Sequence, residues 1–145
     1  MKVLFDTSVL VTAVVDRLPN HAESLACYRR HRRGPGRTAG RCTAHALAEC
    51  YAALTALPVS PRIQPADAER LVAHNFLSDL LVEEATREDY AAALSRVARL
   101  GLASGVVYDA LHLTIAERSG WLRLYTYNIR DFERLAPKRV RVMTP

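Results

Sequence analysis

The stretch Val3-Leu4-Phe5-Asp6-Thr7-Ser8 places an acidic residue directly after a short apolar run at the start of the chain. Lys2–Phe5 is rich in strand-forming residues and predicts a first β-strand, with Thr7 or Ser8 as a cap for the helix that follows. Ligands of open α/β sheets bind outside the carboxyl ends of the strands. Asp6 is therefore either a site residue or only part of a helix cap.

The rest of the chain alternates between helical and strand-like segments. A glycine-rich loop covers Gly34–Gly40, and we expect no repeat or linker that divides the 145 residues. Strands alternating with helices predict an α/β fold with a mostly parallel central sheet covered on both faces, formed as one domain over residues 1–145. The predicted helices are His21–Arg33, a Thr43-capped helix to Leu57, Pro65–Asp79, Arg87–Leu100, Gly105–Ser119 and Asp131–Leu135, and the predicted strands are Leu80–Val82, Leu122–Thr126 and Val140–Met143.

The composition favours a basic cytoplasmic protein. Net charge is +5, carried almost entirely by arginine, and a basic surface favours polyanions such as nucleic acid. Three cysteines at irregular spacing do not form a disulfide framework. No signal peptide or membrane span is predicted, because charged residues interrupt every apolar run.

Acidic residues stand at several positions where a charge is costly. Asp109 lies in the largely apolar helix Gly105–Ser119, where a buried carboxylate requires a partner or a metal ion. A salt bridge with an arginine is the simpler alternative for Asp109. Glu49 lies in an alanine-rich helix, and the simpler alternative to a role in a site is that it is a solvated acid on an amphipathic helix.

A fourth group of polar residues follows the strand Leu122–Thr126. Asn128 and Asp131 supply oxygen atoms there, although an ordinary capped turn has the same pattern. In a parallel α/β fold, Asp6, Glu49, Asp109 and Asp131 can converge on one point. Converging carboxylates repel one another unless a cation intervenes, and an all-oxygen site favours Mg²⁺ or Mn²⁺. Such ions activate water and offset charge on a phosphoryl group.

With these motifs in this order, the chain resembles the PIN-domain ribonucleases, in particular the VapC-type toxins of type II toxin–antitoxin pairs. The matching segments are Val3–Ser8, the helix with Glu49, Tyr108–Leu111 and Thr126–Phe132. The resemblance implies a three-layer α/β/α fold, a bound Mg²⁺ or Mn²⁺ and endonucleolytic cleavage of RNA phosphodiesters. It also implies a cognate antitoxin and, in many members, a homodimer.

The same resemblance assigns roles to individual residues. Asp6, Glu49 and Asp109 match the three core acids that are both catalytic and metal-binding, with Asp131 as the fourth because Asn128 stands where many members have Asp. Asn128 is then a supporting residue, a ligand or a substrate contact. The implied supporting hydroxyls are Thr7 or Ser8, and Thr126.

A run of arginines is the candidate surface for binding RNA. A basic run ends in the glycine-rich loop and can bind phosphates if it lies beside the acids; a solvated helix end is the alternative. Two other functions remain open: a degenerate PIN-like protein that binds RNA without cutting it, and a phosphoesterase of small molecules on a similar scaffold. The candidate RNA-contacting residues are Arg29, Arg30, Arg32, Arg33, Arg37 and Arg41.

Overall fold

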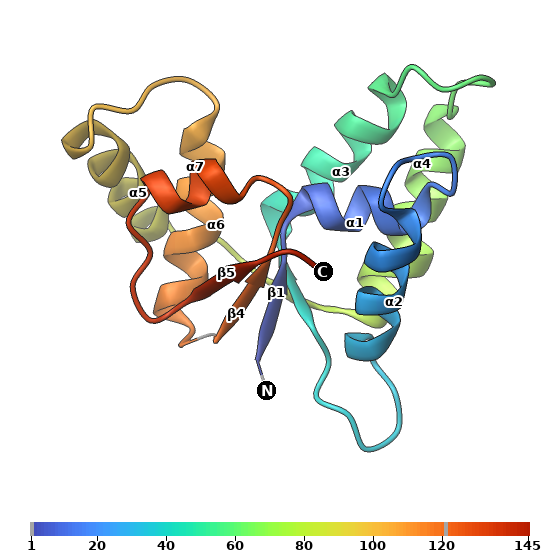
Figure 1. Ribbon diagram of the computed structural model, residues 1–145, viewed down its shortest axis with the longest axis horizontal. Helices are drawn as coiled ribbons and strands as arrows, with labels where there is room; N and C mark the ends of the chain where they lie inside the picture. The colour runs from blue at the N-terminus through green and yellow to red at the C-terminus, as the bar shows by residue number, and fades with distance from the viewer. Residues whose placement is uncertain (1, 121) are drawn as a thin grey trace.

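The computed structural model describes residues 2–120 and 122–145, which form one five-stranded sheet with helices on both faces (Figure 1). The strand order is β3-β2-β1-β4-β5, and all four pairings are parallel. The predicted α/β/α fold with its parallel sheet is therefore confirmed. The strands are β1 (Val3–Phe5), β2 (Arg41–Thr43), β3 (Leu81–Glu83), β4 (Arg123–Tyr125) and β5 (Arg141–Met143).

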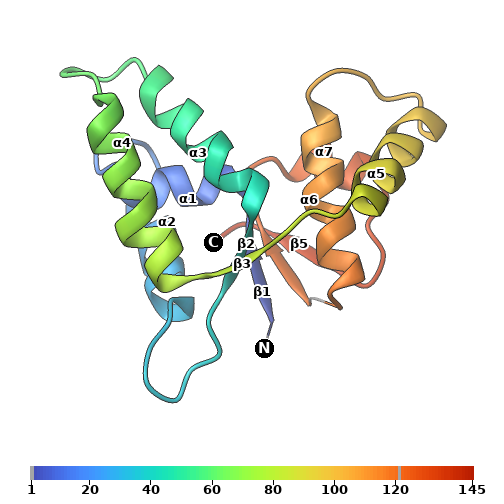
Figure 2. The same ribbon diagram turned by 180° about the vertical axis from the view of Figure 1, so that it is seen from behind.

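The helices form two groups on opposite faces of the sheet, and the views from the front and from behind show the same division (Figures 1 and 2). No helix in the described part of the chain has the length and apolar character that crossing a membrane requires. On one side lie α1 (Thr7–Val14), α2 (His21–His31), α3 (Ala44–Ala56), α4 (Pro65–Leu71) and the π-helical turn η1 (Val72–Leu77), and on the other α5 (Arg87–Arg99), α6 (Val106–Arg118) and α7 (Ile129–Arg134).

Alternating side chains of the central strand β1 supply the two hydrophobic cores. Val3 and Phe5 face the layer of α1 to η1, while Leu4 faces α5, α6 and α7. This alternation follows from the two-residue period of a β-strand. Because both faces of β1 are buried, its register is fixed and the carboxyl end of the strand is held at the centre of the sheet.

Two local predictions are corrected by the structure. The helix after β1 has Asp6 at its N-cap, and no side chain caps it; neither Thr7 nor Ser8 does so, because α1 already begins at Thr7 and Ser8 bonds to Asp6 instead. Strand β2 was not predicted. It has three residues, and only its backbone pairing with β1 and β3 defines it.

The start of α5 is held by an ion pair between a buried carboxylate and a part-exposed guanidinium. Thr86 and Asp89 form a reciprocal capping box, and both carboxylate oxygens of Asp89 accept hydrogen bonds from Arg118 on α6, at 2.8 and 2.9 Å. Burial alone raises the pKa of Asp89, but the bonds from Arg118 and Thr86 outweigh it and lower the pKa below 3.8. The stabilisation is therefore fully present above about pH 4 and is lost as the pH falls through the folded-state pKa.

We expect Asp89→Ala to lower the free energy of unfolding by about 1–2 kcal/mol at pH 7, because it leaves the capping box incomplete and removes the partner of the part-exposed Arg118. Urea denaturation at pH 7 and pH 3 measures this, and the difference from wild type should shrink at pH 3. Asp67→Ala is the matched control, since Asp67 is 58% exposed and lies 3.7 Å from Arg70. Equal losses in the two variants would contradict the assignment.

Candidate functional site

Asp6 lies at the carboxyl end of β1, with its carboxylate buried and fixed by two hydroxyl groups. Ser8 and Thr126 each donate a hydrogen bond of 2.8 Å to Oδ2 of Asp6. Ser8 Oγ in turn accepts from the backbone N–H of Tyr127, and Thr126 Oγ1 from that of Asn128. Because backbone donors occupy the acceptor sides of both hydroxyls, their protons point at Asp6 and fix the orientation of its carboxylate.

The remaining supporting residues behave differently from Ser8 and Thr126. The Thr7 hydroxyl is buried beside the Cys50 thiol and has no hydrogen bond to any carboxylate of the described residues. The side chain of Asn128 is exposed at the start of α7, so this residue contributes to the arrangement through its backbone N–H.

A buried histidine holds Glu49, which lies on α3. Nε2 of His112 is 2.6 Å from Oε1 of Glu49, and Nδ1 of His112 is 2.9 Å from the hydroxyl of Thr43. The same hydroxyl accepts the N–H of Ala46 and caps α3. His112 is 1% exposed. The chain of contacts therefore ties the α3 acid to α6 through one side chain.

The charge state of His112 follows from these contacts. Burial lowers its pKa, but the hydrogen bond to Glu49 and the charges of Asp6, Glu49 and Asp109 outweigh burial, so the pKa is raised above 6.5. In the sequence, His112 has one signal for this role: it lies one helical turn after Asp109 and therefore faces the same region.

Asp109 lies in the first turn of α6, half-buried among the other acids. Its pKa is raised to about 7, first by burial and then by the negative charge of Asp6; His112 opposes the shift, and Asp131 and Glu49 add to it. The structure thus brings Asp109 within electrostatic range of the other three predicted acids. Asp6 follows β1, Glu49 comes from α3 on one side of the sheet, and Asp109 and Asp131 come from α6 and α7 on the other.

Asp131 is the most exposed of the four acids. Its side chain is 43% exposed, and its Oδ1 lies 3.1 Å from the guanidinium of Arg134, one turn later on α7. A surface pair of this kind is weak. Asp131 is therefore able to rotate away from Arg134.

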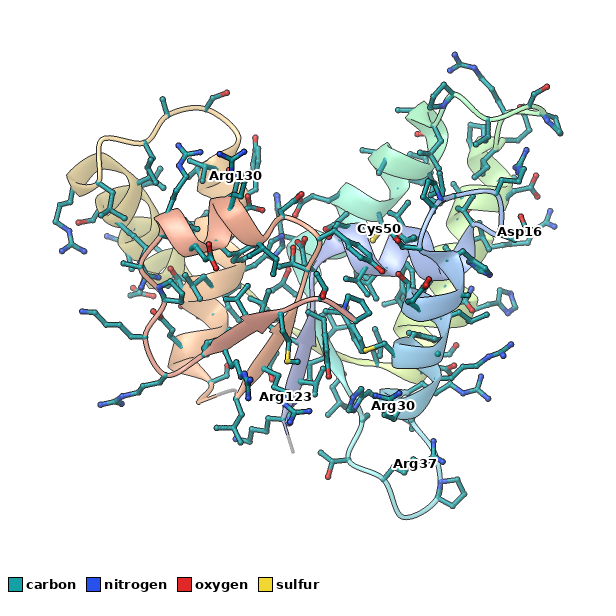
Figure 3. The ribbon with its side chains drawn as sticks, viewed as in Figure 1. Asp16, Arg30, Arg37, Cys50, Arg123 and Arg130 are labelled. Carbon is teal, nitrogen blue, oxygen red and sulfur yellow. The ribbon has the colours of Figure 1, made fainter. Side chains whose placement is uncertain are left out.

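The arginine run lies elsewhere. It occupies the end of α2, the following loop and the start of β2, where the strands begin; Arg30 and Arg37 lie at this end in Figure 3, and Cys50 and Arg130 lie toward the other. Arg41 is paired with Glu83, and Arg32 with Asp79. The run does not line the acidic cluster, so its contact with RNA stays a prediction.

The donor set of the cluster fits a hard divalent cation, although no group of three His, Cys, Asp or Glu side chains in the described segments is already arranged around one point as metal ligands are. Glu49 is engaged by His112, and Asp131 by Arg134. Burial and then the charges of Asp6, Asp131 and Glu49 raise the pKa of Asp109, and Mg²⁺ or Mn²⁺ is suited to balance such carboxylates through oxygen ligands. Zinc fits less well, because burial raises the pKa of Cys42 to about 12 and keeps its thiol protonated.

Comparisons with known proteins agree with this architecture. The family model described as "PIN domain" matches residues 3–138. Ribonuclease VapC27 of Mycobacterium tuberculosis is 38% identical over 106 residues, which are 73% of this chain and 70% of that protein.

Solved structures show the same fold at lower sequence identity. The crystal structure of Mycobacterium tuberculosis VapC20, described as a Sarcin-Ricin loop cleaving toxin, has a TM-score of 0.72 and 17% identity, covering 96% of this chain and 98% of that one. DNA-bound VapBC from Salmonella typhimurium has a TM-score of 0.64 and 20% identity, with 98% of each chain covered. The chain belongs to the PIN-domain family and, within it, to the VapC type.

Proposed function

We propose that this protein is a Mg²⁺- or Mn²⁺-dependent endoribonuclease and the toxin of a toxin–antitoxin pair. The observation that carries the proposal is the placement of Asp109 among Asp6, Glu49 and Asp131, where burial first and then these negative charges raise its pKa to about 7. Such a charge cluster is unfavourable for stability alone and suits a site that binds cations.

Two of the four acids are oriented by hydrogen bonds from neighbouring side chains. Asp6 is held in one orientation by Ser8 and Thr126, while Glu49 is oriented by His112. Asp109 and Asp131 come from α6 and α7, which lie on the opposite face of the sheet from α3. These four residues would hold the cation, with Asp6 as the most buried of them.

When bound, Mg²⁺ or Mn²⁺ supplies Lewis acidity that lowers the pKa of water and offsets charge on a phosphodiester. The chain contributes orientation, because its carboxylates are carried by rigid strand ends and helices, and it contributes general attraction to RNA through its net charge of +5.

The relatives support the choice of substrate and partner. VapC27 is named a ribonuclease, VapC20 is described as cleaving the Sarcin-Ricin loop, and VapBC from Salmonella typhimurium was solved bound to DNA. We infer that this chain cuts RNA, binds a cognate antitoxin, acts as one nuclease domain in the cytoplasm and is able to form a homodimer.

The test is incubation of a mixed pool of tRNA, rRNA and mRNA with purified protein in Mg²⁺, in Mn²⁺ and in EDTA. We expect discrete fragments in either metal and none in EDTA. Asp6→Asn should give no fragments while its circular dichroism stays that of wild type. Intact RNA with folded wild type in both metals would favour a binder that does not cut, and turnover of a chromogenic phosphate ester with RNA untouched would favour a small-molecule phosphoesterase.

A further inference from the structure

An exposed aromatic pair lies directly beside the acidic cluster. The ring of Tyr108 stacks on that of His45, with centroids 5.3 Å apart and planes 14° from parallel. Tyr108 is nevertheless 49% exposed. His45 therefore covers one face of the tyrosine ring, and a large part of the ring remains open to solvent although it sits on an otherwise buried helix.

Tyr108 also borders a shallow depression between α5 and α6. Its volume is about 170 Å³, and its lining is apolar and aromatic. A cavity of about 150 Å³ with apolar walls holds one benzene ring. The depression thus has room for a single flat ring. Its lining consists of Tyr90, Ala93, Leu94, Val107, Tyr108 and Leu111.

The aromatic pair reaches the proposed catalytic acids through His45. Tyr108 immediately precedes Asp109 on α6. On α3, Nε2 of His45 lies 3.7 Å from Oε1 of Glu49. The ring of Tyr108, which lines the depression, is therefore connected to the carboxylate of Glu49 through a single stacked histidine.

We propose that Tyr108 and the depression beside it bind one unpaired nucleobase of the RNA, next to the phosphate that is cut; this rests on the proposed ribonuclease function. A nucleobase is flat and uncharged, so it can approach the carboxylates without the repulsion that a phosphate meets there. Only the sugar separates the base from its phosphate. Unpaired bases are commonly bound by stacking on aromatic side chains.

The chemistry of the depression also sets its selectivity. Its walls offer a stacking surface and almost no hydrogen-bonding groups, and stacking alone tolerates every base. The subsite therefore requires that a base be present and unpaired, and it does not read which base it is.

The test is binding of a fluorescein-labelled oligouridylate in EDTA, where cleavage is excluded, measured by fluorescence anisotropy. Loss of one base–aromatic stack predicts about 5- to 150-fold weaker binding for Tyr108→Ala, while Tyr108→Phe stays within about twofold of wild type. Tyr51→Ala is the matched control, since Tyr51 is 41% exposed and also helical, and it should bind as wild type does. An oligomer of the same length without bases should bind wild type and Tyr108→Ala alike.

Two results would overturn the subsite. In one, Tyr108→Ala binds oligouridylate as tightly as wild type. If the same variant also changes the sedimentation of the protein, the depression is a protein–protein contact and not a base subsite. In the other, Tyr108→Ala weakens binding of the baseless oligomer equally. Wild type that neither binds nor cuts RNA would instead overturn the ribonuclease function, so the two failures are distinguishable.

Discussion

Asp109→Asn should abolish RNA cleavage and at the same time stabilise the metal-free protein at pH 8. Folding raises the pKa of Asp109 from 3.8 to about 7, mainly by burial and by the charge of Asp6. The native state therefore binds more protons than the unfolded state between these values, and wild-type stability falls as the pH rises through this window. Asn has no proton to lose, so the variant escapes this loss.

A rise in pKa from 3.8 to about 7 corresponds to at most about 4 kcal/mol, and since Asp109 is only half-buried we expect a gain of about 1–2 kcal/mol at pH 8. Thermal unfolding in EDTA at pH 8 and pH 4 measures it, and the gain should be absent at pH 4. Cleavage in Mg²⁺ should fall on the order of 1,000-fold or more. Asp67→Asn, on the exposed surface of α4, should change neither quantity. An inactive variant without the gain at pH 8 would show that Asp109 is not under repulsion.

The second large effect is expected at His112. Substitution by Ala removes the donor to Glu49 and the partner of Thr43 from a fully buried position. We expect a loss of about 2–4 kcal/mol in the free energy of unfolding and about 10- to 100-fold in cleavage, as for residues that orient metal ligands.

Two conservative variants separate positioning from packing. Gln places an N–H near the Nε2 position and so retains the bond to Glu49, whereas Asn reproduces only the Nδ1 side toward Thr43. His112→Gln should recover more cleavage and a tighter Mn²⁺ affinity by calorimetry than His112→Asn. Equal recovery by both variants would mean that His112 serves packing alone.

Much of the fold was accessible from the sequence because periodicity and helix-capping signals are local. Thr43 caps α3 as expected, and the capped helix Arg87–Leu100 agrees with α5 to one residue. Strand β2 was missed for the opposite reason: Arg41, Cys42 and Thr43 show no apolar run, and their extended conformation is stabilised by pairing with β1 and β3 on either side.

The candidate site was predictable only to the level of its acids. Asp6 and Asp109 stood out because their surroundings are apolar. The contact of Glu49 with His112 joins residues 63 positions apart and depends on how α3 packs relative to α6, which no local pattern encodes. The position of the arginine run, by contrast, follows from topology. A helix that leads into a parallel strand must end where that strand begins, which is opposite the carboxyl edge that carries Asp6.

The assembly of the acids from both helical layers has a consequence for how activity relates to folding. Asp6 and Glu49 belong to the side of α1 and α3, and Asp109 and Asp131 to the side of α6 and α7. Partly folded forms, in which one layer has left the sheet, retain at most half of the carboxylates. Under the proposed function, RNA cleavage would therefore require both helical layers to be folded onto the sheet. Fragments or misfolded copies would have no residual RNA-cutting activity.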